Sequence, residues 1–280
     1  MPSADRLDHT VINVKFDMDA ATALFGKLGF TLTPRGYHSH GSMNQLMMFG
    51  TDYLELIGIP EGKEIERKDL QNAPVGINGI VLKALDVDDV YARLQNARFD
   101  GDPPRAFHRP VDIEGSQKDA KFRTVTVRNG VFPGGRVYYC EHGTPELVWR
   151  PEWQSHANGV TSMPEFISVA RDADGEAAGF ATLLDTDATM DGNGVRCVTL
   201  NGCRITILTP DQYSNRYGEL ASVMGSRDGI FGAMVFATEG LSKLNDLLGD
   251  LDGVDVNLQP DRTAIRVDAF DAVLEFVEDV

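Results

Sequence analysis

An internal repeat constrains the fold of this chain more than any other feature. Residues 9–60 contain a strand-like alternation of apolar and polar residues, then a helical pattern, then three more short apolar runs. Residues 78–153 repeat that order. Because a repeated unit sets the architecture as a whole, the pattern predicts two consecutive copies of a β-α-β-β-β module.

The second half of the chain predicts two further copies. Residues 164–185 again read as a strand followed by a helix, and Asn201-Gly202 joins two alternating runs, which is a strong hairpin signal. We therefore expect an α+β protein of four βαβββ modules paired into two halves. Residues 1–156 would form the first half, with modules 1 and 2, and residues 157–280 the second, with modules 3 and 4.

Aligning the two modules of the first half places Asn78 opposite His9 and Glu146 opposite Glu55. The two intervals differ in length, so one module must contain an insertion. The stretch 100–119, rich in proline and charged residues, is the segment that we assign to it, as a solvated loop.

Composition excludes several classes of function. With 26 basic and 42 acidic residues the chain has a formal net charge of −16, a field that repels nucleic acids and anionic membranes. No apolar stretch approaches the roughly 18 residues of a membrane span, and no signal peptide is recognisable at the N-terminus. Three cysteines without a CxxC pair indicate free thiols in a reducing compartment, so we expect a cytoplasmic protein.

Several motifs resemble the glyoxalase-like branch of the vicinal oxygen chelate superfamily. They include LDHTVINV, TLTPRGYHSHGSMNQL, YLELIGI, HGTPELVWRPEW and HANG, all within residues 7–159, whereas the architecture resembles it over nearly the whole chain. The resemblance implies that paired modules curl their sheets around an open cup that holds a divalent metal. First and last strands of the modules would supply the ligands, and two neighbouring substrate oxygens would chelate the metal.

Carried over to this chain, the resemblance implies His9, Glu55 and Glu146 as metal ligands. Asn78 departs from the histidine or glutamate usual at its position and leaves these three candidates. One imidazole with two carboxylates suits Zn²⁺, Fe²⁺, Ni²⁺ or Mn²⁺. The alternatives are a packed core histidine at His9 and solvent-facing glutamates at the other two positions.

The remaining candidates also lie in the first half, which contains all six histidines. His142 is a reserve metal ligand or a proton shuttle, and with Glu146 it completes the expected catalytic groups. Arg105 and Arg109, in the assigned insertion, could cover the cup. The residues expected to contact substrate are Arg35, His38, His40 and Asn44.

The leading hypothesis is a metal-dependent lyase or isomerase that acts on a small oxygenated substrate. A metal-free protein that sequesters a small molecule in the same cup is the alternative, and a ring-cleaving dioxygenase is the neighbouring option. Two arrangements of the modules are open: pairing in chain order, or exchange with a second copy in a homodimer.

Overall fold

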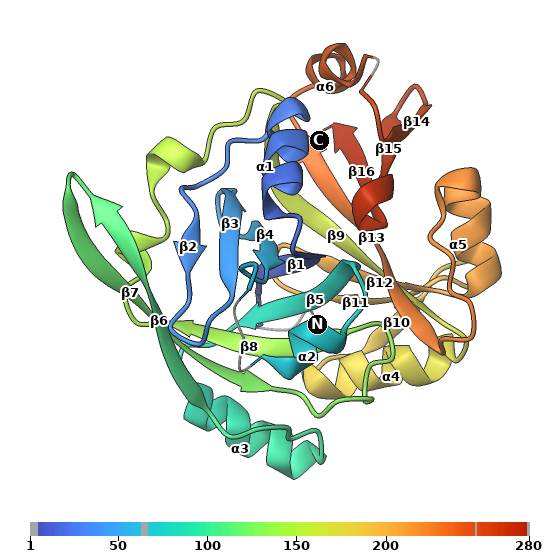
Figure 1. Ribbon diagram of the computed structural model, residues 1–280. Helices are drawn as coiled ribbons and strands as arrows, with labels where there is room; N and C mark the ends of the chain where they lie inside the picture. Colours follow the sequence, from blue (N-terminus) through green and yellow to red (C-terminus); the bar gives the residue numbers. More distant parts are fainter. Residues whose placement is uncertain (1–4, 63–66, 250, 279–280) are drawn as a thin grey trace.

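The computed structural model describes residues 5–62, 67–249 and 251–278. Its strands form two eight-stranded mixed sheets (Figure 1). The first sheet has the order β2-β3-β4-β1-β5-β8-β7-β6, and the second repeats it as β10-β11-β12-β9-β13-β16-β15-β14. The predicted α+β architecture of four modules in two paired halves is therefore confirmed.

Each module of the first sheet closes by pairing its first strand with its last. β1 runs parallel to β4, and β5 runs parallel to β8. β1 and β5 pair antiparallel, so modules 1 and 2 join in chain order within one chain. The elements of this half are β1 (Leu7–Lys15), α1 (Met18–Lys27), β2 (Gly36–Tyr37), β3 (Met43–Met48), β4 (Tyr53–Gly58), α2 (Lys68–Asn72), β5 (Gly76–Lys83), α3 (Val87–Ala97), β6 (Arg105–Ile113), β7 (Ser116–Thr126), β8 (Arg136–His142), η1 (Pro145–Leu147) and η2 (Pro151–Trp153).

The second sheet follows the same plan. β9 and β12 are parallel, β13 and β16 are parallel, and β9 pairs antiparallel with β13. The elements of this half are β9 (Val160–Ala170), α4 (Ala173–Leu183), β10 (Ala188–Met190), β11 (Arg196–Thr199), β12 (Arg204–Leu208), α5 (Pro210–Tyr217), η3 (Gly218–Leu220), β13 (Gly229–Thr238), α6 (Leu241–Leu248), β14 (Val254–Leu258), β15 (Arg262–Val267), η4 (Asp268–Phe270) and β16 (Ala272–Glu278).

The prediction of a loop insertion at residues 100–119 is wrong. Residues 105–113 form β6, which pairs along its whole length with β7, and Figure 1 shows this hairpin extending from the first sheet. Glu114 and Gly115 both have positive φ, as a tight two-residue hairpin turn requires. Pro110 has no backbone N–H group, and it is tolerated because β6 is the edge strand of the sheet.

The hairpin changes which strand closes the second module. Its three later strands are β6, β7 and β8, so β8 is the last strand and lies beside β5. The segment expected to be that strand forms η1 instead, and Glu146 is exposed on it. The alignment of Glu146 with Glu55 is therefore wrong.

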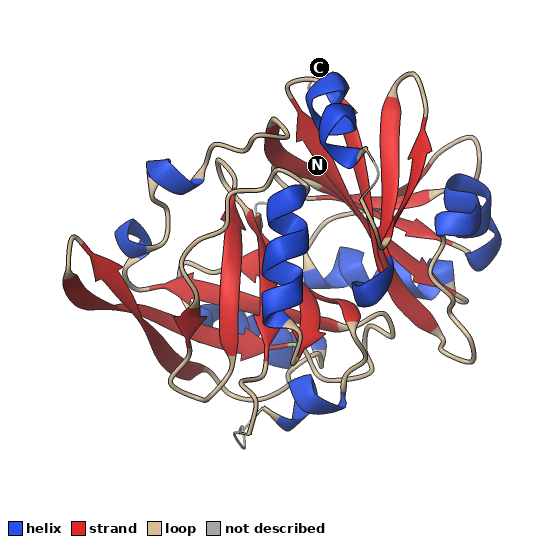
Figure 2. Ribbon diagram, turned by 45° about the horizontal axis from the view of Figure 1, so that its top comes forward, coloured by secondary structure: helices blue, strands red, loops and turns tan. Residues whose placement is uncertain are grey.

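One hydrophobic core is shared by the two sheets. It contains residues of β1 and β9 and of helices α1, α3, α4 and α6, while smaller clusters occupy the opposite face of each sheet. Across the shared core the Thr10 hydroxyl contacts the sulfur atoms of Met163 and Met234. Figure 2 shows the two groups of strands with the helices packed around them. The division at residue 156 stays a prediction, since the core is continuous across it.

None of the helices within the described ranges is long and apolar enough to cross a membrane.

Candidate active site

The first sheet surrounds a cavity of about 660 Å³, which we call the cup. That volume lies within the usual range for a small-molecule site. β1, β3 and β4 contribute polar side chains to one wall, and the hairpin of β6 and β7 contributes to the other. Five of the predicted site residues line the cup: His9, His38, His40, Asn44 and Glu55.

His9 lies between two buried carboxylates. Its Nδ1 atom is 2.7 Å from Asp8 Oδ1, and its Nε2 atom is 3.5 Å from Glu55 Oε2. The ring stacks on Tyr53 with 4.4 Å between centroids, and the Tyr138 hydroxyl is 3.4 Å from Nε2. Burial opposes a charge on the ring, but the hydrogen bonds and charges of both carboxylates raise the pKa of His9. The site therefore favours positive charge at His9.

His38 approaches Glu55 through the Asn44 amide. Asn44 Nδ2 donates to Glu55 Oε1 at 2.7 Å and lies 3.2 Å from His38 Nε2. Burial lowers the pKa of His38 to about 3, so its ring is neutral, and Nδ1 bonds the Ser42 hydroxyl at 2.8 Å. The lone pair on His38 Nε2 therefore points toward the Asn44 amide and the cup.

Glu55 is ionised in this setting. Its burial would raise the pKa, but His9 and His38 and the Asn44 amide lower the pKa of Glu55 to about 2. A carboxylate beside one imidazole, with a second imidazole joined to it through an amide, offers oxygen and nitrogen donors that suit a divalent cation.

Asn78, which the module alignment places opposite His9, is bonded to the guanidinium of Arg136. Asn78 Oδ1 accepts a 2.8 Å hydrogen bond from Arg136 Nε, and Arg136 also pairs with Asp69 at 3.3 Å. At the position that the module alignment pairs with His9, the second module therefore offers an amide bonded to a guanidinium.

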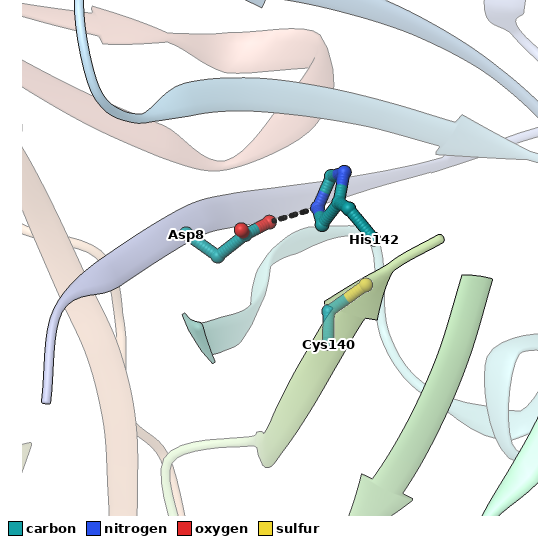
Figure 3. Close-up of side chains that lie close together, drawn as sticks. All are labelled: Asp8, Cys140 and His142. Atoms are coloured by element: carbon teal, nitrogen blue, oxygen red, sulfur yellow. Dashed lines mark hydrogen bonds and ion pairs between the residues drawn. The ribbon is translucent and has the colours of Figure 1, made fainter. Parts of the chain in front are cut away.

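A further cluster lies where β1 and β8 meet. Asp8, Cys140 and His142 each offer a ligand atom within 4.8 Å of the others. Figure 3 shows the three side chains close together. Asp8 Oδ1 is already shared by His9 and by His142 Nε2 at 3.1 Å. Burial holds the pKa of the Cys140 thiol well above its ordinary value, so the thiolate that a metal needs is disfavoured. We interpret Asp8 as the anion that orients two imidazoles.

Two of the residues predicted for the site, Glu146 and Arg35, lie outside the cup. Glu146, on η1, does not line the cup. Arg35 also lies outside it, because its guanidinium pairs with Asp19 of α1 at 2.6 Å and with Gln45. His142 contacts Asp8 within the cluster of Asp8, Cys140 and His142, so its role as a reserve metal ligand or proton shuttle stays a prediction. Asp8 and Tyr138 were missed, although an acid inside the apolar run of β1 is a detectable signal.

These features define a protein of the vicinal oxygen chelate class: paired βαβββ modules with a first-strand histidine and a last-strand glutamate in one cup. The profile of the family described as "Glyoxalase-like domain" matches residues 7–184, so the chain belongs to this family. No curated protein matches the chain.

Solved structures share the fold at low sequence identity. A hypothetical protein from Staphylococcus aureus has a TM-score of 0.68 at 13% identity, over 98% of this chain and 100% of that one. A mutant 4-hydroxymandelate synthase from Streptomyces coelicolor has a TM-score of 0.58 at 13% identity, over 99% and 93%. A fusion protein of a xylose isomerase-like TIM barrel with 4-hydroxyphenylpyruvate dioxygenase scores 0.59 at 12% identity, over 99% and 50%.

Proposed function

We propose that the chain is a metal-dependent enzyme of the lyase or isomerase type, acting on a small oxygenated molecule in the first-half cup. The observation that carries the proposal is the 3.5 Å approach of His9 Nε2 to Glu55 Oε2, with His9 Nδ1 tied to Asp8. A metal-binding histidine usually donates its other ring N–H group to a carboxylate, as His9 does.

His9 and Glu55 would hold the metal, and His38, whose Nε2 atom accepts from the Asn44 amide, is a further imidazole of the cup. The bound metal would act as a Lewis acid toward substrate oxygens. Burial holds the pKa of Tyr138 above its ordinary value, so its hydroxyl stays protonated and can donate a hydrogen bond to a substrate oxygen beside His9. Tyr53, stacked on the imidazole, fixes the ring plane.

A metal-free binding protein is the second candidate. The hydrogen bond between Asn78 and Arg136 favours it, because a fixed cation near the cup opposes a second positive charge. In that case the imidazolium of His9 would serve as the only cation between Asp8 and Glu55.

Metal titration of untagged protein separates the two candidates. We expect one equivalent of Zn²⁺, Mn²⁺, Ni²⁺ or Fe²⁺ to bind wild type, and His9→Ala and Glu55→Gln to abolish binding. Cys140→Ser is the matched control, because it removes a donor of the cluster beside the cup and should leave the stoichiometry unchanged. Absence of metal binding by wild type would exclude the metal-dependent enzyme, and retention by His9→Ala would exclude His9 as its ligand.

Reaction type needs a separate readout. Lyase and isomerase reactions of α-hydroxy carbonyl compounds move the proton on the carbon beside the carbonyl. We expect the metal-loaded wild type to exchange that proton with deuterium oxide, followed by NMR on a panel of α-hydroxy ketones and aldehydes. Exchange that persists unchanged in Glu55→Gln would show that the cup is not responsible.

A further inference from the structure

The charged side chains of the cup have the opposite balance to the chain as a whole. The formal net charge of the protein is −16, yet basic residues outnumber acidic ones along the described lining of the cup. The basic residues there are Arg67, Lys68, Arg105, Arg109, Arg128 and Arg136. The acidic residues are Glu55, Asp69, Asp100 and Asp102. Such a cavity concentrates anions that the rest of the surface repels.

Several of these cations already have partners in the protein. Arg67 donates hydrogen bonds to both carboxylate oxygens of Asp69, from Nε to Oδ1 at 2.9 Å and from Nη2 to Oδ2 at 2.8 Å. Arg136 bonds Asn78 and Asp69, and Arg128 donates to the Arg98 carbonyl at 2.8 Å. Their charge is therefore offset locally.

Arg109 differs from them. It is only 3% exposed, and its Nη2 atom has no hydrogen-bond partner among the described residues. Glu55, whose charge acts on it, is already bonded by Asn44 and paired with His9. Burial of the guanidinium lowers the pKa of Arg109. A buried cation without a hydrogen-bonded anion is costly, and an unsatisfied group of this kind calls for an explanation such as an anionic ligand.

The fold makes room for this side chain. Phe107, Arg109 and Val111 alternate with exposed residues along β6, so they share the face that is turned inward. On β2, a Cβ atom at Gly36 would lie 2.9 Å from Arg109 Cδ and 3.0 Å from Nη1. The absence of a side chain at Gly36 therefore allows the guanidinium to lie beside the Asn44 amide.

We propose that Arg109 is the anchor for an oxyanion on the ligand of the cup, a carboxylate or a phosphate, with the apolar part of the ligand packed on Phe107 and Phe122. A guanidinium matches the two oxygens of either group. The two phenyl rings stack with 5.1 Å between their centroids, and both line the cup. The inference names the substrate class of the proposed function and rests on it for the choice of cup, but binding through Arg109 needs no metal.

Calorimetry on EDTA-treated protein tests the anchor independently of the metal. The probes are 3-phenyllactate, its neutral amide 3-phenyllactamide, and phenyl phosphate. We expect the acid or the phosphate to bind wild type, the amide to bind at least about 10-fold more weakly, and Arg109→Gln to lose about 10-fold or more in affinity for the anion. The tighter of the two anions identifies the source of the oxyanion.

Arg128→Gln is the matched control, since that arginine also lines the cup but bonds a backbone carbonyl, and its affinity for the anion should change less than about 2-fold. Thermal unfolding checks folding: Arg109→Gln should melt no lower than wild type without ligand, because an unpaired buried charge is removed. Equal binding of acid and amide, unchanged affinity in Arg109→Gln, or no binding of either anion by wild type at millimolar concentration would overturn the proposal. Failure of the metal titration alone would leave the anchor intact.

Discussion

Both halves of the molecule have a pair of buried carboxylates with a basic side chain between them, but the basic side chain differs. In the first half, the imidazole of His9 lies between Asp8 and Glu55. In the second half, Arg216 Nη2 lies 3.1 Å from Glu165 Oε2 and 3.0 Å from Glu275 Oε1. Each half therefore places one cation between two buried carboxylates on its sheet.

The two basic side chains differ in whether they can lose their positive charge. Imidazole can give up its proton and its place to a metal, whereas a guanidinium stays charged at all physiological pH values. Arg216 reaches its carboxylates from α5, which follows the third module as α2 follows the first. Arg67, which directly precedes α2, lines the first cup and pairs with Asp69. The comparison separates a half whose central cation can be exchanged from a half whose two carboxylates are held by a permanent charge, beside a second cavity of about 700 Å³.

Removing the second-half cation should have the largest effect. Arg216→Met leaves Glu165 and Glu275 buried with less compensation, and we expect about 3–5 kcal/mol loss in the free energy of unfolding. Urea denaturation followed by circular dichroism measures it. A loss below about 1 kcal/mol would mean that solvent or Arg262, which also pairs with Glu275 at 3.3 Å, replaces the lost charge.

Glu176, in the second half, is buried and bonds a hydroxyl group, so its pKa shows the effect of burial without a neighbouring cation. Glu176 bonds Ser168 at 2.6 Å, and burial raises the pKa of Glu176 from 4.5 to about 7. The folded state therefore keeps a proton that the unfolded chain loses above about pH 4.5, so stability falls as pH rises toward 7. We expect Glu176→Gln to gain about 2–3 kcal/mol relative to wild type between pH 4 and pH 8. Parallel unfolding curves of the two proteins across this range would contradict it.

The first-half cation can be weakened without removing it. Asp8→Asn keeps the shape but removes the charge that faces His9 Nδ1. We expect the metal affinity of the proposed site to fall about 10- to 100-fold, as for other partners of metal-binding histidines. Competition titration against a chelating dye measures the change, with the exposed substitution Asp19→Asn as control. Unchanged affinity would show that Asp8 does not orient the ring for a metal.

The smallest expected effect comes from an exposed arginine that contacts the same carboxylate as Arg216, and it tests whether the burial of an ion pair determines its contribution to stability. Arg204 Nη2 also bonds Glu165 Oε1 at 2.9 Å, but the Arg204 side chain is 52% exposed. Arg204→Met should cost at most about 1 kcal/mol in the free energy of unfolding, because water replaces an exposed partner. A cost equal to that of Arg216→Met would remove the distinction between the two arginines.

Sequence reasoning found the parts of the site that local patterns encode. His9 and Glu55 were predicted to share a module, and β1 and β4 do lie side by side. It failed where one segment carried mixed signals: prolines and charges concealed β6, which shifted the end of the second module and misplaced Glu146. Asp8 was overlooked although it lies inside the apolar run of β1, and the second imidazole that it contacts, on His142, is far away in the sequence.

The sequence by itself determined the four modules and their class, because strand and helix periodicity is local and was repeated often enough to be read. Only the tertiary structure decided that modules pair in chain order. It also decided which cation meets which carboxylate: His9 between its neighbours, Arg216 across the second half, and Arg109 with an Nη2 atom that has no hydrogen-bond partner among the described residues. Charge pairing depends on distances of a few ångströms between segments far apart in the chain, and no local pattern records them.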